Sequence, residues 1–188
     1  MPDIASQRAA AIRCARAWLR TPYHHRARVK GAGVDCAMLL AEVYAEAGLV
    51  PALDIPHYPP DWHLHRDSER YLGFVRDHAV EIAGPPAPGD IALWRFGRCF
   101  SHGAIVVLWP NIIHAYLGRG CVYEDALGAE WLSRMGEGRD ARAKPRPVKF
   151  FTLKQWADDA MHHGGTESTE KQKCFSPCSS RLRGEEIS

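Results

Sequence analysis

A proline- and glycine-rich break at residues 84–89, with the sequence GPPAPG, divides the chain into two halves of different texture. Glycine and proline interrupt regular structure because glycine frees the backbone torsions and proline fixes one of them. Before the break, apolar residues recur at three- and four-residue spacing, which is typical of helices, whereas short β-rich runs dominate after it. Helices followed by consecutive strands predict an α+β fold with an antiparallel sheet.

Two segments of the first half have helical spacing. Apolar side chains in 5–20 recur among arginines, which predicts an amphipathic helix that Thr21 and Pro22 end. Apolar residues in 36–47 follow the same spacing, and Gly48 stands where glycine often caps a helix. Further expected elements are helices over 67–82 and 153–162, irregular chain over the proline-rich 51–63, and strands over 90–95, 102–108, 112–117, 121–125 and 147–152.

The length of 188 residues allows one well-buried core and is short for two. We therefore expect a single domain over residues 1–163. The sequence over 164–188 is polar and holds few apolar residues to bury, which predicts a flexible C-terminal tail. Two of the six cysteines, Cys174 and Cys178, fall in this tail.

The N-terminal segment is basic, with seven bases and no acid between Asp3 and Asp35, although the formal net charge of the chain is only +2. These bases either form the solvated face of the first helix or attract an anionic polymer such as the bacterial wall. So small a net charge does not indicate a nucleic-acid partner. Because arginines interrupt every apolar stretch, neither a signal peptide nor a membrane span is indicated. We expect synthesis in the cytoplasm and reduced cysteines.

Cys36 is a candidate nucleophile because of its place at the start of the 36–47 helix. Asp35 is a suitable N-cap, so the thiol would meet unpaired backbone N–H groups and the positive end of the helix dipole. Such an environment favours the thiolate, which is the attacking form. We therefore expect Cys36 to ionise readily and to react with iodoacetamide faster than Cys14 at neutral pH. The alternative is that Cys36 simply belongs to the apolar face of the helix.

His102 and His114 each interrupt an otherwise apolar strand, where a titratable ring is costly to bury without a partner. They are 12 residues apart, and the turn signal at 109–111 lies near their midpoint. A hairpin there would make them neighbours on adjacent strands. One ring could take the thiol proton while the other orients it. Either histidine alone could also be a satisfied core residue.

A zinc site is an alternative, because Cys99, His102, His114 and Cys121 offer four ligand types that zinc accepts. The spacing argues against it. If 99–102 is regular strand, Cys99 and His102 are an odd number of residues apart and face opposite sides of the sheet. We therefore expect no metal.

The ordered set of blocks in this chain resembles the NlpC/P60 family of cysteine peptidases. The blocks are Thr21-Pro22-Tyr23, Val34-Asp35-Cys36, Pro88-Gly89-Asp90-Ile91-Ala92-Leu93, Ser101-His102-Gly103-Ala104-Ile105-Val106 and Ile113-His114-Ala115. Their order and spacing are similar to those of the family over roughly residues 10–125. The stretch Tyr58-Pro59-Pro60-Asp61-Trp62-His63-Leu64-His65 is similar to the phage and gene-transfer-agent tail subgroup.

The resemblance implies a papain-like fold, with the nucleophile at a helix N-terminus packed on the sheet, and a peptidase that needs no cofactor. Cys36 would attack a peptide carbonyl and form a thioacyl intermediate, with His102 as general base and His114 orienting it. The substrate would be peptidoglycan stem peptides, typically at the bond between D-γ-glutamyl and a diamino acid. Tyr23, Asp35 and Ser101 would be substrate-binding residues, although Tyr23 could equally pack beside the first helix and Asp35 could serve only as a cap.

Two departures from the family pattern concern the surroundings of the nucleophile. The family usually has Asp-Cys-Ser-Gly, whereas this chain continues with Ala37 and Met38, so any contact of that serine is absent. The interval between Tyr23 and Cys36 is expanded by residues 24–28 relative to the family pattern. No catalytic group is missing.

Two other functions are compatible with the same residues. The chain could be a structural or assembly component of a phage-like tail that retains the peptidase fold and docks to tail proteins. It could also be a papain-like amidase that cuts another bond of the cell wall. A wall enzyme made in the cytoplasm would reach its substrate through a tail particle, lysis or another carrier.

Overall fold

The structure, a computed structural model, describes residues 2–59, 69–126 and 146–157. Three α-helices precede or interrupt the strands: α1 (Ile4–Ala17), α2 (Cys36–Glu46) and α4 (Arg70–His78). The main strands are β3 (Ala79–Ile82), β4 (Ile91–Phe96), β5 (Cys99–Leu108), β6 (Asn111–Tyr116), β7 (Cys121–Ala126) and β8 (Val148–Leu153). Smaller elements are β1 (Arg28–Val29), β2 (Gly33–Val34) and the 3-10 turn η1 (Leu117–Arg119).

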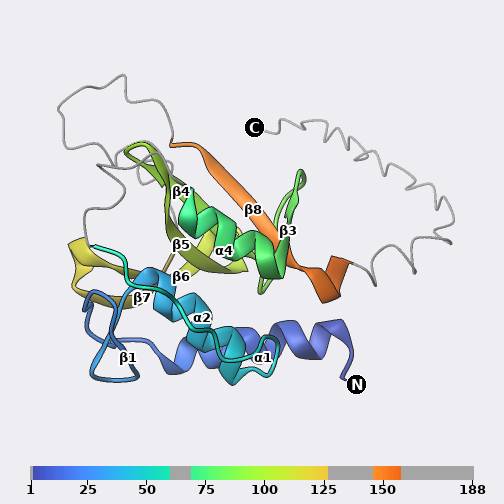
Figure 1. Cartoon of the computed structure of the whole chain (residues 1–188). Helices are drawn as coiled ribbons and strands as arrows, with labels where there is room; N and C mark the ends of the chain where they lie inside the picture. The colour runs from blue at the N-terminus through green and yellow to red at the C-terminus, as the bar shows by residue number, and fades with distance from the viewer. Residues whose placement is uncertain (1, 60–68, 127–145, 158–188) are drawn as a thin grey trace, which may run out of the picture.

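The main sheet has six antiparallel strands in the order β3-β8-β4-β5-β6-β7. The strands β4 to β7 follow one another along the chain, as the sequence predicts. The last strand, β8, inserts between β3 and β4, so the final described strand lies inside the sheet rather than at its edge (Figure 1). The predicted α+β architecture with an antiparallel sheet is confirmed.

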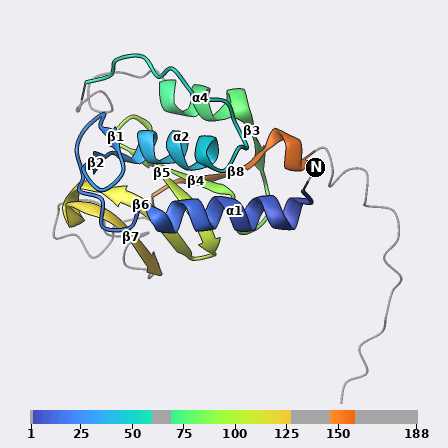
Figure 2. The same cartoon turned by 90° about the horizontal axis from the view of Figure 1, so that it is seen from below.

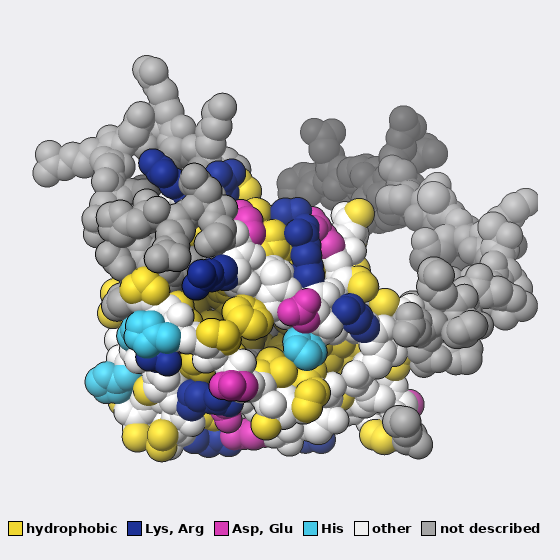
Figure 3. Space-filling model, in the orientation of Figure 1, with side chains coloured by type: hydrophobic (Ala, Val, Ile, Leu, Met, Phe, Trp, Pro, Cys, Tyr) yellow, Lys and Arg dark blue, Asp and Glu magenta, His cyan; other side chains and the backbone are white. Residues whose placement is uncertain are grey.

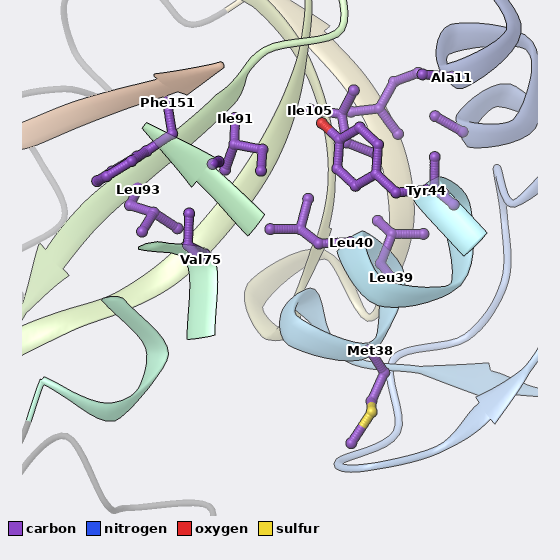
Figure 4. Packing of buried hydrophobic residues seen from close by; sticks show 14 of the residues in the cluster. Ala11, Met38, Leu39, Leu40, Tyr44, Val75, Ile91, Leu93, Ile105 and Phe151 are labelled. Atoms are coloured by element: carbon purple, nitrogen blue, oxygen red, sulfur yellow. The ribbon is translucent and has the colours of Figure 1, made fainter. Parts of the chain in front are cut away.

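The helices pack on one face of the sheet (Figures 1 and 2). Burial of their apolar faces against the strands removes hydrocarbon from water, which is the main favourable contribution to folding. Figure 4 shows Leu40 of α2 pointing toward Val75 of α4 and Ile91 of β4, with Tyr44 beside Ile105 of β5. A smaller cluster on the opposite face is built around Trp94.

Helix α1 is fixed to the sheet by Arg8. Its guanidinium donates to a carboxylate oxygen of Asp90 at 2.8 Å and to the Pro88 carbonyl at 2.7 Å. It also lies over the ring of Trp156, 4.3 Å from the ring centroid. The Asp90 carboxylate is only 2% exposed, so its charge is compensated by the arginine rather than by water. The Pro88-Gly89-Asp90 block is therefore an anchor for α1.

The basic N-terminal residues are largely paired within the chain. Besides Arg8 with Asp90, Arg16 contacts Glu124, Arg28 contacts Glu42, and Lys30 contacts Glu46. Four of the seven bases are therefore compensated by acids of the same chain.

Helix α2 begins at Cys36 as predicted, with Asp35 as its N-cap. The Asp35 carboxylate accepts the backbone N–H of Met38 at 2.9 Å, which satisfies one of the unpaired donors of the first turn. The helix lies very close to β5 at Gly103. A Cβ at Gly103 would come 2.8 Å from Leu40 Cδ1 and would overlap the Tyr71 hydroxyl. Only glycine allows this approach, which brings the start of α2 against the strand that carries His102.

Residues 50–59 run back along α2 toward its N-terminus and beside α4 (Figures 1 and 2). We call this segment the strap. It has no regular secondary structure, as its prolines predict. Side chains hold it in place: Arg28 donates to the Leu53 carbonyl at 3.1 Å, and Tyr58 donates to Asp35 at 2.7 Å.

Some predicted boundaries were wrong. Helix α4 ends at His78, and 79–82 form strand β3 rather than continuing the helix, because they pair with β8. The first helix ends at Ala17, four residues before Thr21. Of the predicted 153–162 helix, residues 154–157 are helical, and the rest lies outside the described residues. The predicted domain end at 163, the tail 164–188 and its two cysteines also lie outside them.

Helices long and apolar enough to cross a membrane are absent from the described part of the chain.

Candidate active site

The rings of His102 and His114 are in direct contact, as predicted from their spacing. His102 Nε2 and His114 Nδ1 are 2.7 Å apart. The hairpin turn falls at 109–110, and the register of β5 and β6 pairs Ile105 with Ile113. Continued along the strands, this register puts the two histidines on diagonal positions of one face. The predicted hairpin geometry is confirmed.

Aromatic side chains enclose the histidine pair. Trp94, the cross-strand partner of His102, lies 6.0 Å from its ring, and Phe96 lies 5.3 Å from it. Tyr116 stacks on His114 with ring centroids 5.9 Å apart. His102 is 6% exposed and His114 is fully buried. This apolar enclosure favours uncharged imidazoles.

The Cys36 thiol lies against β5, next to the backbone of Ser101 and Gly103, the two residues that flank His102. Its sulfur approaches the Ser101 carbonyl at 3.8 Å, and the backbone N–H of Gly103 is also directed at it. The N–H groups of Cys36 and Ala37 at the start of α2 point to the sulfur as well. Cys36 and His102 line one cavity. Cys36 and His102 thus line the same cavity, and their roles as nucleophile and base stay predictions.

The expectation that Cys36 ionises readily was wrong. Burial raises the pKa of the Cys36 thiol to about 12, and the negative charge of Asp35 adds to the increase. The three N–H groups lower the pKa, but their effect is smaller. Helix starts favour thiolates only where the sulfur keeps enough solvation, and here the apolar cavity and the adjacent carboxylate outweigh the helix.

The two histidines are also held neutral. Burial lowers the pKa of His102 to about 3, with a smaller effect from the Arg146 guanidinium. Burial likewise lowers the pKa of His114 well below its usual value, and the neighbouring His102 adds to this. At neutral pH the Cys36 thiol is therefore protonated and both imidazoles are uncharged.

Asp35 is engaged by four groups of its own chain. In addition to the Met38 N–H, its carboxylate accepts the Arg26 N–H at 2.7 Å and the Tyr58 hydroxyl at 2.7 Å. The His25 ring approaches it at 3.4 Å and also contacts the Tyr58 carbonyl at 2.9 Å. Asp35 thus joins α2, the 24–28 insertion and the strap.

The other two predicted substrate-binding residues also line the cavity. The Tyr23 backbone bridges to Val34 and bonds to Gly120, which places its half-buried side chain beside Cys36. Burial and the nearby Cys36 raise the pKa of Tyr23, so its hydroxyl stays protonated. Ser101 offers its carbonyl to the thiol, while its hydroxyl is turned toward the Phe96 carbonyl.

The cavity has a volume of about 740 Å³ and opens on the face in Figure 3, where hydrophobic side chains surround a hollow. Sequence reasoning missed three of its wall residues, Tyr44, Tyr58 and Tyr71. Tyr44 stands out in the sequence only as one more apolar position of α2. Tyr58 stands out only as the first residue of the stretch similar to the tail subgroup, and Tyr71 lies in a segment without a motif. Contacts made across the fold were needed to place both at the cavity.

No cluster of metal-binding side chains occurs among residues 2–59, 69–126 and 146–157. The four cysteines in these ranges, Cys14, Cys36, Cys99 and Cys121, are free thiols.

Comparison with solved structures identifies the fold. The chain aligns with the NlpC/P60 domain of the peptidoglycan hydrolase SagA with a TM-score of 0.50 and 18% identity, over 76% of this chain and 96% of that one. It has the NlpC/P60 fold. NlpC2 from Trichomonas vaginalis aligns with a TM-score of 0.50 and 17% identity, over 81% of this chain and 50% of that one. No family model and no curated protein matches the sequence.

Proposed function

We propose that this protein is an NlpC/P60 cysteine peptidase that hydrolyses peptidoglycan stem peptides, at the bond between D-γ-glutamyl and a diamino acid. The observation that carries the proposal is that Cys36, at the start of α2, lines one cavity with His102, whose ring contacts His114. The fold shared with SagA, which is a peptidoglycan hydrolase, supports the choice of substrate.

The neutral resting site is suited to general-base catalysis. As the Cys36 sulfur attacks the carbonyl carbon, the thiol proton passes to His102 and the carbon–sulfur bond forms. His102 Nε2 contacts His114, so Nδ1 is the nitrogen that takes the proton. In this tautomer His102 Nε2–H donates to His114 Nδ1 and keeps the ring oriented. Protonated His102 then gives the proton to the leaving amine.

Backbone donors at the start of α2 stabilise the charge that develops on the carbonyl oxygen. The N–H of Cys36 is directed into the site, and the Tyr23 hydroxyl lines the same cavity. A water molecule, deprotonated by His102, then attacks the thioester and releases the acid. Ser101 positions the thiol through its carbonyl, and Asp35 holds the helix start and the strap.

The biological setting is part of this proposal. The stretch that begins with Tyr58 and Pro59 is similar to tail-associated members of the family, so we propose synthesis in the cytoplasm and delivery to the wall by a phage-like tail particle.

Digestion of purified muropeptides tests the proposed function. Wild-type protein should release fragments whose masses show cleavage after D-γ-glutamyl, and Cys36→Ala should release none. Cys14→Ala is the matched control, since Cys14 is a partly buried free thiol on α1, and it should cut like the wild type. Cleavage by Cys36→Ala, or masses that show a cut at another wall bond, would overturn the corresponding part of the proposal.

A further inference from the structure

The cavity extends well beyond the residues needed for stem-peptide chemistry. It follows α4 from Arg70 to His78, about 12 Å at 1.5 Å per residue. Its floor is formed by α2 and its outer wall by the strap. The apolar side chains of these elements that line it are Ala37, Leu40, Ala41, Val50, Leu53, Ile55, Phe74 and Val75.

Three of the five tyrosines that line the cavity, Tyr44, Tyr58 and Tyr71, contribute rings rather than hydroxyl groups. Tyr44 donates its hydroxyl to the Gly89 carbonyl at 2.8 Å, and Tyr71 donates to the Cys36 carbonyl at 3.1 Å. Tyr58 donates to Asp35. Each hydroxyl is therefore committed to the protein, and burial raises the pKa of all three phenols, which keeps them uncharged. A ligand in the cavity would therefore contact the aromatic rings of these three tyrosines rather than their hydroxyl groups.

The one carboxylate next to Cys36 among the cavity residues, Asp35, is similarly committed. Its oxygens already accept two backbone N–H groups and a hydroxyl, and a substrate amine would have to displace them. Charged side chains of α4 that border the cavity, Arg70 and Asp77, are exposed and so lie at its mouth. The interior beside the thiol suits an apolar group better than a charged one.

We propose that the site has a further activity, the hydrolysis of acyl esters whose acyl group is an unbranched apolar chain lying along α4 under the strap. The inference rests on the proposed nucleophile, Cys36, but not on stem-peptide specificity. The sulfur attacks the ester carbonyl, the carbon–oxygen bond breaks, and the leaving alcohol takes the thiol proton through His102. Water then hydrolyses the thioester, releases the carboxylic acid, and returns a proton to the sulfur.

A series of p-nitrophenyl esters tests the length dependence with the full chain. From acetate through butyrate and hexanoate to octanoate, kcat/KM should rise by about fourfold per added methylene, since each buried CH₂ contributes about 0.8 kcal/mol. The rise should vanish in Cys36→Ala. Equal kcat/KM for acetate and octanoate in the wild type would overturn the inference.

Gly73 is an exposed residue of α4 at the border of the cavity, where a larger side chain would narrow the opening. It lies on α4 in the cavity wall, and a Cβ built there meets no atom within 4 Å. Gly73→Phe should abolish the preference for long acyl chains while acetate is still hydrolysed. The matched control is Gly84→Phe, because Gly84 also has open space at its Cβ but does not line the cavity. Octanoate preference kept in Gly73→Phe would contradict the assigned location.

The outcomes separate this inference from the proposed function. Ester hydrolysis that depends on Cys36 and on chain length, without muropeptide cleavage, supports the inference and refutes the stem-peptide substrate. Muropeptide cleavage, together with ester hydrolysis that does not depend on acyl-chain length, supports the stem-peptide substrate and refutes the inference. No turnover of either substrate would refute the nucleophile and both proposals with it.

Discussion

The two ends of α2 each lie beside a buried aspartate, and the two carboxylates are satisfied in different ways. Asp90, near the C-terminal half of the helix, faces the guanidinium of Arg8 at 2.8 Å. Asp35, at the N-terminus, is bound by two backbone amides and the Tyr58 hydroxyl. Both are 2% exposed, so burial does not distinguish them.

The difference lies in where the negative charge acts. At Asp90 a cation offsets it, and the pair serves to hold α1 on the sheet. At Asp35 the amide and hydroxyl donors leave a net negative charge beside Cys36, which helps to raise the pKa of the thiol. We therefore expect substitutions at the Asp90 end to change stability and substitutions at the Asp35 end to change thiol chemistry.

The largest expected effect is on catalysis at the Cys36 end. His102→Ala removes the proton acceptor and should lower kcat/KM for muropeptides by about a thousandfold or more. The free energy of unfolding should change much less, because the ring is enclosed but not a major part of the core. His24→Ala, an exposed histidine outside the cavity, is the control and should have wild-type activity. A His102→Ala protein with near-normal activity would refute the assigned base.

At the Asp90 end the expected effect is on stability. Arg8→Met keeps an unbranched apolar side chain but leaves Asp90 buried without its cation, which should cost about 3 kcal/mol. Arg16→Met is the matched control on the same helix: its partner Glu124 is more exposed, and the loss should be below about 1 kcal/mol. Urea denaturation measures both. Equal losses would show that burial of the Asp90 pair has no special role.

The histidine pair should make the protein sensitive to acid. Because burial lowers the pKa of His102 to about 3, the unfolded chain binds a proton below pH 6.5 that the folded chain does not. The free energy of unfolding should therefore be highest above pH 6.5. It should fall by about 1.4 kcal/mol per pH unit for each histidine as the pH decreases toward 3. Denaturation at pH 7, 6 and 5 should show a shallower slope in His102→Gln. The same slope in both proteins would contradict a buried neutral ring.

The smallest effect is expected from neutralising Asp35. Asparagine also caps helices, so Asp35→Asn should retain α2 while it lowers the pKa of Cys36. Alkylation of Cys36 at pH 8 should become several-fold faster. Asp3→Asn makes the same change at the N-cap of α1 and should leave the rate unaltered. A slower reaction in Asp35→Asn would show that the carboxylate does not oppose the thiolate.

Local spacing in the sequence was enough to predict the framework of the site. The apolar repeat after Asp35 predicted α2 and put Cys36 at its start, and the turn between His102 and His114 predicted their contact. Both inferences depend on residues near one another in the chain, where helix and hairpin geometry fixes the distances.

The rest of the site depends on contacts that spacing does not encode. Tyr58 reaches Asp35 across 23 positions from a strap without periodicity, and β8 inserts between β3 and β4. The pKa of Cys36 was mispredicted for the same reason: the helix start is visible in the sequence, but the enclosing cavity is a property of the whole fold.

The pH dependence of Cys36 alkylation tests most directly the central claim that the Cys36 thiol and the two imidazoles are uncharged at neutral pH. Wild-type protein is treated with iodoacetamide from pH 5 to 10, and the Cys36 peptide is quantified by mass spectrometry. We predict slow labelling at pH 7 and a rate that rises about tenfold per pH unit through pH 10, as expected for a thiol whose pKa is about 12. A fast, constant rate between pH 5 and 8, the signature of a preformed thiolate–imidazolium pair, would contradict it.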